Sequence, residues 1–316
     1  MYAYELTNYT YIPVSLNILT EKKKFHLLNG NYMSCEFSLR LMDKICAYQN
    51  GTFVVDLKEI NLGDSRCFTS FNEIFKDFPE SHIIFVNFNE IIKDFLVNDC
   101  SGYLEYNEEH EIISCSSGLT TFTDKIKHNQ NIQKDVIDYI TSKIKENVVE
   151  EEQLIRSSNV FVNKYIDLKS LFLFPAIYYL LFFELALLIN DSFDEFCKLI
   201  CCSYNGAVTA TILGQLLNTE VIFLMNLGPS ISYNNIEMVE NIENGKKYLF
   251  VADMICLGSE FNLTKTIVKL RKADLLGVAS IINYLKPWYS EKTVSLIDIQ
   301  DNDSFDYCVK VKKVGC

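Results

Sequence analysis

Positive charge is scarce in this sequence. Its 316 residues include 29 Lys and Arg against 41 Asp and Glu, which gives a formal net charge of -12 at pH 7. Non-specific binding to nucleic acid or to an anionic membrane depends on a basic surface, so this balance argues against both kinds of partner. A small basic pocket for an anionic ligand remains compatible with it.

Metal-binding and disulfide patterns are also missing. None of the eleven cysteines forms a CxxC pair, and the four histidines stand alone, at positions 26, 82, 110 and 128. This spacing is typical of free thiols in a reducing compartment and not of a zinc site or a disulfide framework. The first residues, MYAYELTNYTYIPVS, lack the basic and apolar regions of a signal peptide. We therefore expect a cytoplasmic protein without a metal site of its own.

Low-complexity tracts and internal repeats are absent, and 49% of the residues are hydrophobic. A chain of this length and composition can bury a large core, and we expect two domains. Apolar runs of helical and strand type alternate in residues 1–128, which predicts a smaller α/β domain there. Its expected elements are helices at 37–49, 71–78 and 89–96, strands at 52–57 and 82–87, and a hairpin at 103–115.

Residues 129–157 are predicted to form a connecting helix, because isoleucine and valine recur at helical spacing at positions 132, 136, 140 and 144. The acidic run at 150–152 is interpreted as a solvated face. Residues 158–316 form the second predicted domain, in which strands and helices alternate, as expected for a mainly parallel sheet flanked by helices. Its first predicted strands lie at 160–166, 196–202 and 220–225, and a helix is expected at 207–217.

One apolar segment, LFLFPAIYYLLFFELALLI at residues 171–189, is nearly long enough to cross a membrane. Pro175 suits the first turn of a helix, and Glu184 interrupts the apolar run. A helix buried between a sheet and a second layer accounts for the segment as well. We predict the buried helix and no membrane association.

The segment KYLFVADMICLGSEFNLTKTIVKLRKADLLGVASIINY, residues 247–284, predicts a strand, a turn, an amphipathic helix and a second strand. Such a βαβ unit has parallel strands and a right-handed crossover. The turn follows the carboxyl end of a strand and opens a helix, which is the usual place for an anionic ligand in α/β folds. By geometry alone, a tight turn without a ligand accounts for the pattern equally well.

Four segments of residues 158–290 resemble motifs of type I phosphoribosyltransferases, with the layout of the orotate enzymes. VNKYIDLK at 162–169 resembles their tyrosine-containing segment, CSYNGA at 202–207 their pyrophosphate loop, and 220–225 the strand before their mobile loop. Residues 248–260 stand at the diphosphoribose-binding signature. The resemblance implies a nucleotide or phosphosugar ligand, with magnesium only if a diphosphate is bound. It implies a ligand-binding site formed by Ser203, Asn205, Gly206, Asp253, Gly258, Ser259 and Glu260, with Lys169 as a nearby cation.

The chain departs from that family at the residues on which transfer chemistry depends. Of the two acids that hold the ribose hydroxyls in the family, the first is replaced by Ala252 and only Asp253 remains. Glu260 stands in the phosphate cradle, where like charges 4 Å apart repel by about 1 to 4 kcal/mol at effective dielectric constants of about 80 to 20. Residues 221–244, which correspond to the mobile loop, contain no Lys, Arg or His to neutralise a leaving pyrophosphate. We therefore assign no catalytic residue.

The N-terminal domain resembles a STAS-like domain more distantly. GTFVVDLKEI at 51–60, followed by Asp64-Ser65, a helix and the strand at 82–87, is similar to the strand-helix-strand core of that family. Ser65 stands about where some members carry a phosphorylated serine, although an ordinary polar turn residue accounts for it as well.

Two functional hypotheses follow from these resemblances. In the first, a catalytically degenerate phosphoribosyltransferase-like protein senses a nucleotide or binds a partner protein or a second copy of itself, and the STAS-like half relays the state. In the second, the chain is an active phosphoribosyltransferase or nucleoside-processing enzyme whose basic residues come from another chain. Magnesium-dependent binding of phosphoribosyl diphosphate would favour the second hypothesis.

Overall fold

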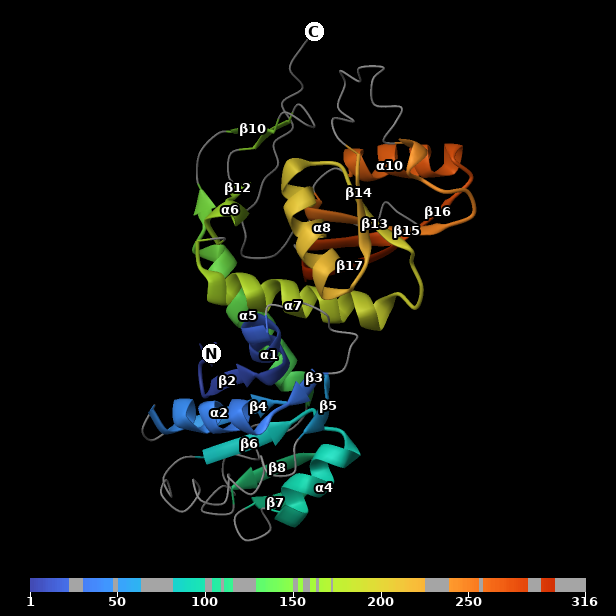
Figure 1. Ribbon diagram of the computed structural model, residues 1–316. Coiled ribbons are helices and arrows are strands. Elements are labelled where there is room, and N and C mark those ends of the chain that lie inside the picture. The colour runs from blue at the N-terminus through green and yellow to red at the C-terminus, as the bar shows by residue number, and fades with distance from the viewer. Residues whose placement is uncertain are drawn as a thin grey trace. The chain divides into compact units, whose positions relative to one another are not determined.

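The computed structural model describes residues 1–22, 31–47, 51–63, 82–99, 104–108, 111–115, 129–149, 153–155, 160–162, 165–171, 173–224, 239–255, 258–283 and 291–298. The chain divides into two compact units, Met1–Tyr139 and Ile140–Cys316. Each unit is built around a sheet of its own (Figure 1).

The first unit contains a six-stranded mixed sheet with the order β1-β2-β4-β6-β8-β7. Its three central strands are parallel, namely β2 (Thr10–Pro13), β4 (Thr52–Asp56) and β6 (His82–Val86). The outer strands are antiparallel to their neighbours, namely β1 (Tyr4–Glu5), β7 (Leu104–Asn107) and β8 (Ile112–Cys115). A separate parallel pair is formed by β3 (Asn31–Met33) and β5 (Ile60–Gly63).

The described helices that lie wholly in this unit are α1 (Val14–Lys22), α2 (Cys35–Ala47) and α4 (Glu90–Asp99). The predicted strands at 52–57 and 82–87, the helices at 37–49 and 89–96 and the hairpin at 103–115 are confirmed to within a few residues. The predicted helix at 71–78 and Ser65 lie outside the described residues. The STAS-like assignment of this unit stays a prediction.

The helix α5 (Asn129–Lys145) begins in the first unit and continues into the second. It ends well before residue 157, so the predicted connecting helix is wrong in its second half. The chain instead forms short strands, β9 (Val148–Val149) and β10 (Gln153–Ile155). The single strand predicted at 160–166 is correspondingly divided into β11 (Val160–Val162), which is antiparallel to β10, and β12 (Tyr165–Ile166), which is antiparallel to β9. Pairing between these segments overrides the local helical periodicity.

The second unit is built on five parallel strands in the order β14-β13-β15-β16-β17. These strands are β13 (Lys198–Cys201), β14 (Glu220–Phe223), β15 (Lys247–Ile255), β16 (Asp274–Asn283) and β17 (Lys292–Asp298). Parallel strands cannot be joined by hairpins, so the chain crosses over a face of the sheet between them. The predicted α/β class, with a mainly parallel sheet flanked by helices, is confirmed.

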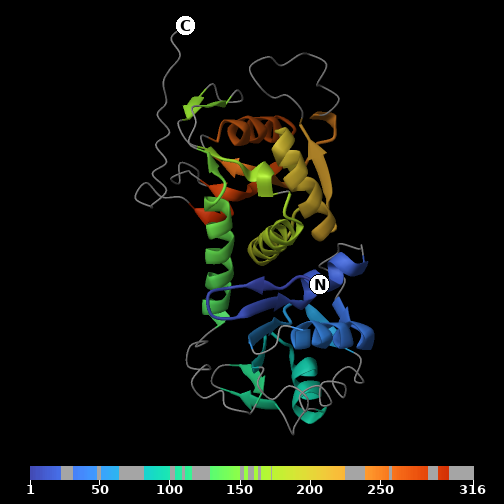
Figure 2. The same cartoon turned by 90° about the vertical axis from the view of Figure 1, so that its left-hand side faces the viewer.

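The described helices that lie wholly in this unit are α6 (Leu168–Leu171), α7 (Pro175–Ser192), α8 (Tyr204–Leu216) and α10 (Ser259–Leu270). Of these, α7, α8 and α10 pack on the sheet, and α6 contacts α7. The helix α8 packs on β13, β14 and β15 and against α7, which itself packs on β16 and β17. The helix α10 packs on β16, and Figures 1 and 2 show α7 and α10 on opposite sides of the strands.

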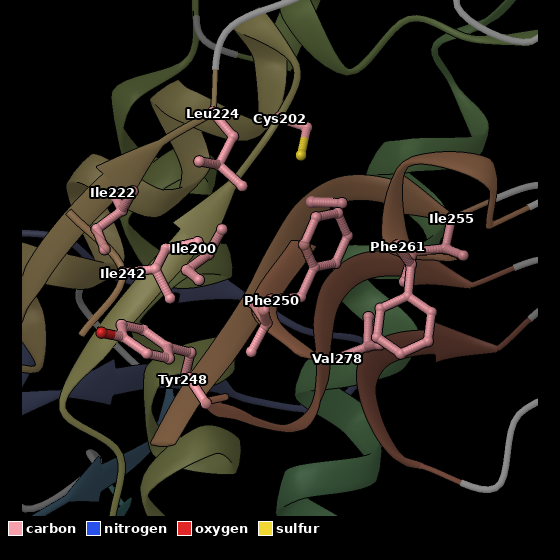
Figure 3. Packing of buried hydrophobic residues seen from close by; sticks show 13 residues of the cluster. Ile200, Cys202, Ile222, Leu224, Ile242, Tyr248, Phe250, Ile255, Phe261 and Val278 are labelled. Carbon is pink, nitrogen blue, oxygen red and sulfur yellow. The ribbon is translucent and has the colours of Figure 1, made fainter. Parts of the chain in front are cut away.

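Alternation along β15 divides its side chains between the two faces of the sheet. Phe250 and Ala252 belong to a buried cluster that also contains Phe261 of α10 (Figure 3). The rings of Phe250 and Phe261 have centroids 5.7 Å apart. Because consecutive residues of a strand point to opposite faces, Asp253 points away from this cluster and toward the face that α8 covers.

The predicted buried helix of residues 171–189 corresponds to α7. It starts at Pro175, as predicted, and residues 180–187 are all buried, Glu184 among them. By length and composition, α7 is the one helix in the described part of the chain that could cross a membrane. Its packing on β16, β17 and α8 is that of a core helix, which agrees with the prediction.

Candidate functional site

The carboxyl ends of β13 and β15 are neighbours at the centre of the five-stranded sheet. After β13 the chain passes through α8 to β14 on one side, whereas after β15 it passes through α10 to β16 on the other side. The direction in which strands are added to the sheet therefore reverses between β13 and β15. In open α/β sheets, ligands bind at the carboxyl ends of the strands where this reversal occurs.

The helix α8 begins directly after β13 with a side-chain cap. Ser203 is the N-cap residue in an extended conformation, and its Oγ accepts a hydrogen bond from the backbone N–H of Gly206 at 3.1 Å. A Cβ atom at position 206 would lie 2.9 Å from this Oγ, so glycine allows the cap to close. One of the free amides at this helix N-terminus is therefore already occupied by the protein itself.

The helix α10 begins with a sharp turn at Gly258. This residue has φ 65° and ψ 18°, the left-handed conformation that glycine adopts most readily, and it provides no side-chain cap. Ser259, the first residue of the helix, is exposed, and Glu260 lies in the first turn. The positive end of the helix dipole favours a negative charge at this position, whether that charge belongs to a ligand or to the chain.

The buried side chain of Thr264 joins α10 to the residue that follows β13. The Thr264 Oγ1 lies 2.8 Å from the Sγ of Cys202 and donates to the backbone carbonyl of Glu260 at 2.8 Å. Cys202 directly precedes the cap residue Ser203 in sequence. The first turn of α10 is thus held beside the N-terminus of α8, and the two helix N-termini converge on one place.

The carboxylate of Asp253, in β15, interacts with side chains from α8 and α6. Asp253 is partly buried near the end of β15, and burial raises the pKa of its carboxyl. The pKa is lowered to a smaller extent by hydrogen bonds from the backbone and from the side chain of Asn205, and by the charge of Lys169. Because Asn205 lies in the first turn of α8 and Lys169 in α6, these two helices supply polar groups to the same carboxylate.

Glu260 brings a second carboxylate to this place. Burial raises the pKa of Glu260, and the negative charge of Asp253 raises it further, whereas a hydrogen bond with the side chain of Ser203 lowers it. The carboxylate of Glu260 therefore interacts with both Ser203, the N-cap residue of α8, and the carboxylate of Asp253. The site combines two acids with a hydroxyl, an amide and one ammonium group.

The residues predicted for the ligand site are brought together by the fold to different degrees. Asp253 interacts with Asn205 and Lys169, and Glu260 interacts with Asp253 and Ser203. The two glycines shape the starts of the helices, and Ser259 contributes an exposed position at the start of α10. Their role in binding a ligand stays a prediction. The segment 225–238, which contains most of the predicted mobile loop, lies outside the described residues.

The adjacent thiols at the end of β13 are buried and poorly suited to act as nucleophiles. Burial raises the pKa of both Cys201 and Cys202 to about 12, and the charge of Glu260 adds to this rise. A thiol with such a pKa is almost entirely protonated at neutral pH, whereas the thiolate is the reactive form. The interpretation of these cysteines as packed side chains agrees with their position.

Two residues at the site escaped sequence reasoning. Thr264 has no motif of its own, and its contact with Cys202 joins segments 62 residues apart. Tyr204 lies between the predicted residues Ser203 and Asn205 and is 79% exposed, which makes it the most exposed large hydrophobic side chain among the described residues. Its position at the first turn of α8 follows from the Ser203 cap, a signal that the sequence did contain.

No group of three or more His, Cys, Asp or Glu side chains suited to a metal ion occurs among the residues described above. The paired carboxylates of Asp253 and Glu260 therefore lack a third such ligand within those residues.

The chain matches no protein-family model and no curated protein. Among solved structures it is similar to an adenine phosphoribosyltransferase from Rhodothermus marinus, with 14% identity, 51% of this chain and 99% of that chain covered, and a TM-score of 0.39. It is also similar to the orotate phosphoribosyltransferase of Aeropyrum pernix, with 12% identity, 52% and 93% coverage, and a TM-score of 0.41. The orotate phosphoribosyltransferase of Mycobacterium tuberculosis H37Rv gives 13% identity, 52% and 97% coverage, and a TM-score of 0.39.

Proposed function

We propose that the second unit is a catalytically degenerate, phosphoribosyltransferase-like module that binds a ribose-bearing ligand of the nucleotide or phosphosugar class and acts in regulation. The observation that carries this proposal is the pairing of Asp253 with Glu260 at the carboxyl ends of β13 and β15. The position of these residues at the reversal of strand order supports a ligand site, but the two carboxylates give it a charge opposite to that required for transfer.

The loss of transfer activity follows from that charge. Departure of a pyrophosphate group needs positive charge that is already in position, and electrostatic stabilisation of this kind is usually the largest contribution to catalysis. Within the described residues, Lys169 is the cation that acts on Asp253, and its effect on the pKa is smaller than that of burial. Residues 221–244 add no Lys, Arg or His. The site is therefore unable to balance the charge of a leaving diphosphate.

The capacity to bind a ligand rests on the polar groups that converge on Asp253. A carboxylate next to the Asn205 amide offers an acceptor and a donor to a pair of neighbouring hydroxyls, as on a ribose ring. The N-terminus of α10 has no side-chain cap from Gly258, so its backbone amides remain available for further hydrogen bonds. The exposed ring of Tyr204 lies next to these groups in sequence and is suited to contact an apolar part of the ligand.

Regulation is proposed because the chain contains a second compact unit besides the one that holds the candidate site. A cytoplasmic module that binds a ligand without converting it needs a second surface through which it acts, and the first unit, with its STAS-like resemblance, is the candidate for this role. Its partner would be another protein or a second copy of the chain.

Calorimetric titration with phosphoribosyl diphosphate, with and without magnesium, tests the proposal against the active-enzyme alternative. We expect weak binding that magnesium does not strengthen, and no release of pyrophosphate. Tight magnesium-dependent binding with turnover on the order of 1 per second or faster would establish the enzyme instead.

The variant Asp253→Asn tests whether the site is the one described. We expect it to weaken binding of ribose-bearing ligands at least tenfold, because an amide accepts hydroxyl hydrogen bonds less strongly than a carboxylate does. Asp274→Asn is the matched control, since Asp274 is an exposed acid at the amino end of β16, at the opposite edge of the sheet. Equal affinities of the two variants would show that Asp253 does not contribute to ligand binding.

A further inference from the structure

We propose that residues 173–179, the apolar segment formed by the start of α7 and the two residues before it, are a surface at which a second copy of this chain binds. This inference goes beyond the proposed function, because it does not depend on whether the candidate site binds a ligand.

The apolar segment is exposed although its composition is that of a buried helix. Its sequence is LFPAIYY, and no charged residue occurs anywhere in residues 170–183. Residues 180–187 of α7 are all buried, whereas Leu173 is 77% exposed, Phe174 is 54% exposed and residues 176–179 are half-buried. A helix that is apolar on every side normally lies inside a protein. Within the described part of the chain, the start of α7 lacks such a cover.

The backbone of the apolar segment is held in one conformation. The Phe174 amide donates a hydrogen bond to the Leu171 carbonyl of α6 at 3.0 Å, and the Tyr178 amide donates to the Phe174 carbonyl at 3.1 Å. The ring of Tyr178 packs edge-on against the buried ring of Phe182, with centroids 4.8 Å apart. A surface that is ordered before association loses less conformational entropy when it binds. The segment is therefore suited to recognition.

The residue types of the segment are those found at the centre of protein interfaces. Aromatic side chains are enriched there, while Lys, Glu and Asp are depleted. The segment contains one phenylalanine and two tyrosines and has no charged residue. Since a few large side chains usually contribute most of the binding energy, we expect Leu173 and Phe174, the two most exposed, to be central to the interface.

The charge of the chain favours a second copy as the occupant. With a formal net charge of -12, two copies repel each other at most approaches. The uncharged segment lets them meet without placing like charges opposite each other. A two-fold axis allows the same patch to serve on both copies. An anionic membrane or a strongly charged partner would instead require complementary charges, which residues 170–183 do not contain.

The expected dimer is weak. A standard interface buries about 800 Å² on each partner, whereas one fully buried aromatic side chain contributes about 150 to 250 Å². The apolar segment therefore supplies the centre of an interface of modest size. We expect a dimer that dissociates on dilution and not a permanent one.

The proposed interface adjoins the candidate site. The apolar segment directly follows α6, and α6 contacts α7 (Figure 1). Lys169 of α6 is exposed, and its charge acts on Asp253. A second copy bound at the apolar segment would therefore lie next to the helix that supplies this cation.

Sedimentation velocity of the full-length protein at about 1 to 100 µM tests the proposal, since weak interfaces associate in this range. We expect the unmodified protein to form more dimer as its concentration rises, and Leu173→Glu to raise the dissociation constant at least tenfold. Leu270→Glu is the matched control, because Leu270 is also 77% exposed and ends α10. It should associate like the unmodified protein.

Leu173→Lys separates burial of the segment from general repulsion. This change adds one positive charge, so the formal net charge of -12 becomes -11 and repulsion between copies decreases. We nevertheless expect at least tenfold weaker association, because the interface would bury an unpaired charge. Circular dichroism shows whether each variant is folded, and the exposure of Leu173 predicts that both of its variants are.

Three results would overturn the proposal. They are an unmodified protein that stays monomeric up to about 100 µM, equal effects of Leu173→Glu and Leu270→Glu, and a dimer that Leu173→Lys leaves unchanged or strengthens. If the protein is monomeric and binds neutral phosphatidylcholine vesicles, a lipid surface is the occupant and the second copy is wrong. None of these results bears on ligand binding, which the calorimetric titration measures separately.

Discussion

The consecutive residues Ala252 and Asp253 lie on opposite faces of β15, and their surroundings differ accordingly. Ala252 is 3% exposed and packs in the cluster with Phe250 and Phe261. An acid there would have to be desolvated within an apolar core, which is costly unless it is paired. Asp253 points to the other face, where it interacts with Asn205 and Lys169. Of these two positions, only 253 is therefore compatible with a carboxylate in this chain.

The paired carboxylates predict how stability depends on pH. Burial raises the pKa of both Asp253 and Glu260 in the folded protein, whereas an unfolded chain titrates such groups near about 4. Between these values the folded state holds more protons, so these groups make stability fall as the pH rises, until the pH exceeds the folded pKa. Glu260→Gln should therefore stabilise the protein relative to the unmodified chain at pH 7.5 and have little effect at pH 4.

Urea unfolding of both proteins at pH 4, 5.5 and 7.5 measures this difference. Glu195→Gln removes an exposed charge and should give a difference that does not change with pH. If Glu260→Gln raised the free energy of unfolding by the same amount at every pH, the electrostatic explanation would be wrong.

At the scale of elements, the contact between β13 and α10 positions the site. Thr264 makes this contact through a buried hydroxyl, while Thr266, two residues later on the same helix, makes a similar bond to the Asn262 carbonyl at 2.9 Å on the exposed side. Both threonines donate a hydrogen bond to the carbonyl four residues earlier. Only Thr264 is buried and also contacts Cys202. They are therefore a matched pair for testing how firmly α10 is held.

Thr264→Val keeps the shape of the side chain and removes its hydroxyl. We expect a loss of about 1 to 3 kcal/mol in the free energy of unfolding, because the thiol of Cys202 loses its partner in the core. Thr266→Val should cost about 0.5 kcal/mol or less, as is usual for exposed positions. Chemical denaturation of the two variants provides the comparison, and equal losses would mean that the buried contact does not hold α10.

Most elements of the second unit were predictable from local pattern, but their contacts were not. The turn into α10 was expected because Gly258 and Glu260 follow an apolar run, and α8 was expected three residues later than its observed start because the cap at Ser203 was not used to place it. The division of residues 160–166 between two sheets depends on pairing with β9 and β10. Such pairing is a contact between two segments, and the periodicity of neither segment reveals it. For the same reason, Thr264 could not be identified in advance.

At the scale of the whole molecule, α5 is the helix within which the chain passes from one unit to the other. Ile132 and Val136 are buried in the half that belongs to the first unit, and Ile140 and Ile144 are buried in the half that belongs to the second. Tyr9 also donates a hydrogen bond to Asp135 of this helix at 2.9 Å. A continuous α5 is therefore expected to couple the unfolding of the two units.

A proline in the middle of α5 tests this coupling. Asp138 is exposed, so Asp138→Pro changes no buried side chain but interrupts the helix at a cost of about 3 kcal/mol or more. We expect calorimetric unfolding to separate into two transitions, and a ribose-bearing ligand to raise the midpoint temperature of only one of them. Asp138→Ala should unfold like the unmodified protein. A single transition in Asp138→Pro would mean that the units are coupled by other contacts.

The strand order of the second unit has a consequence for the rate at which it folds. Every neighbouring pair in β14-β13-β15-β16-β17 is parallel, and the central pair joins Lys198 to Tyr248 across α8 and β14. No pair can therefore form from a local hairpin, and the chain must close long loops before any strand contact stabilises it. High contact order of this kind slows folding, whereas the antiparallel pairs β1-β2 and β7-β8 of the first unit are local. The residues of the candidate site would therefore come together only after these long loops have closed.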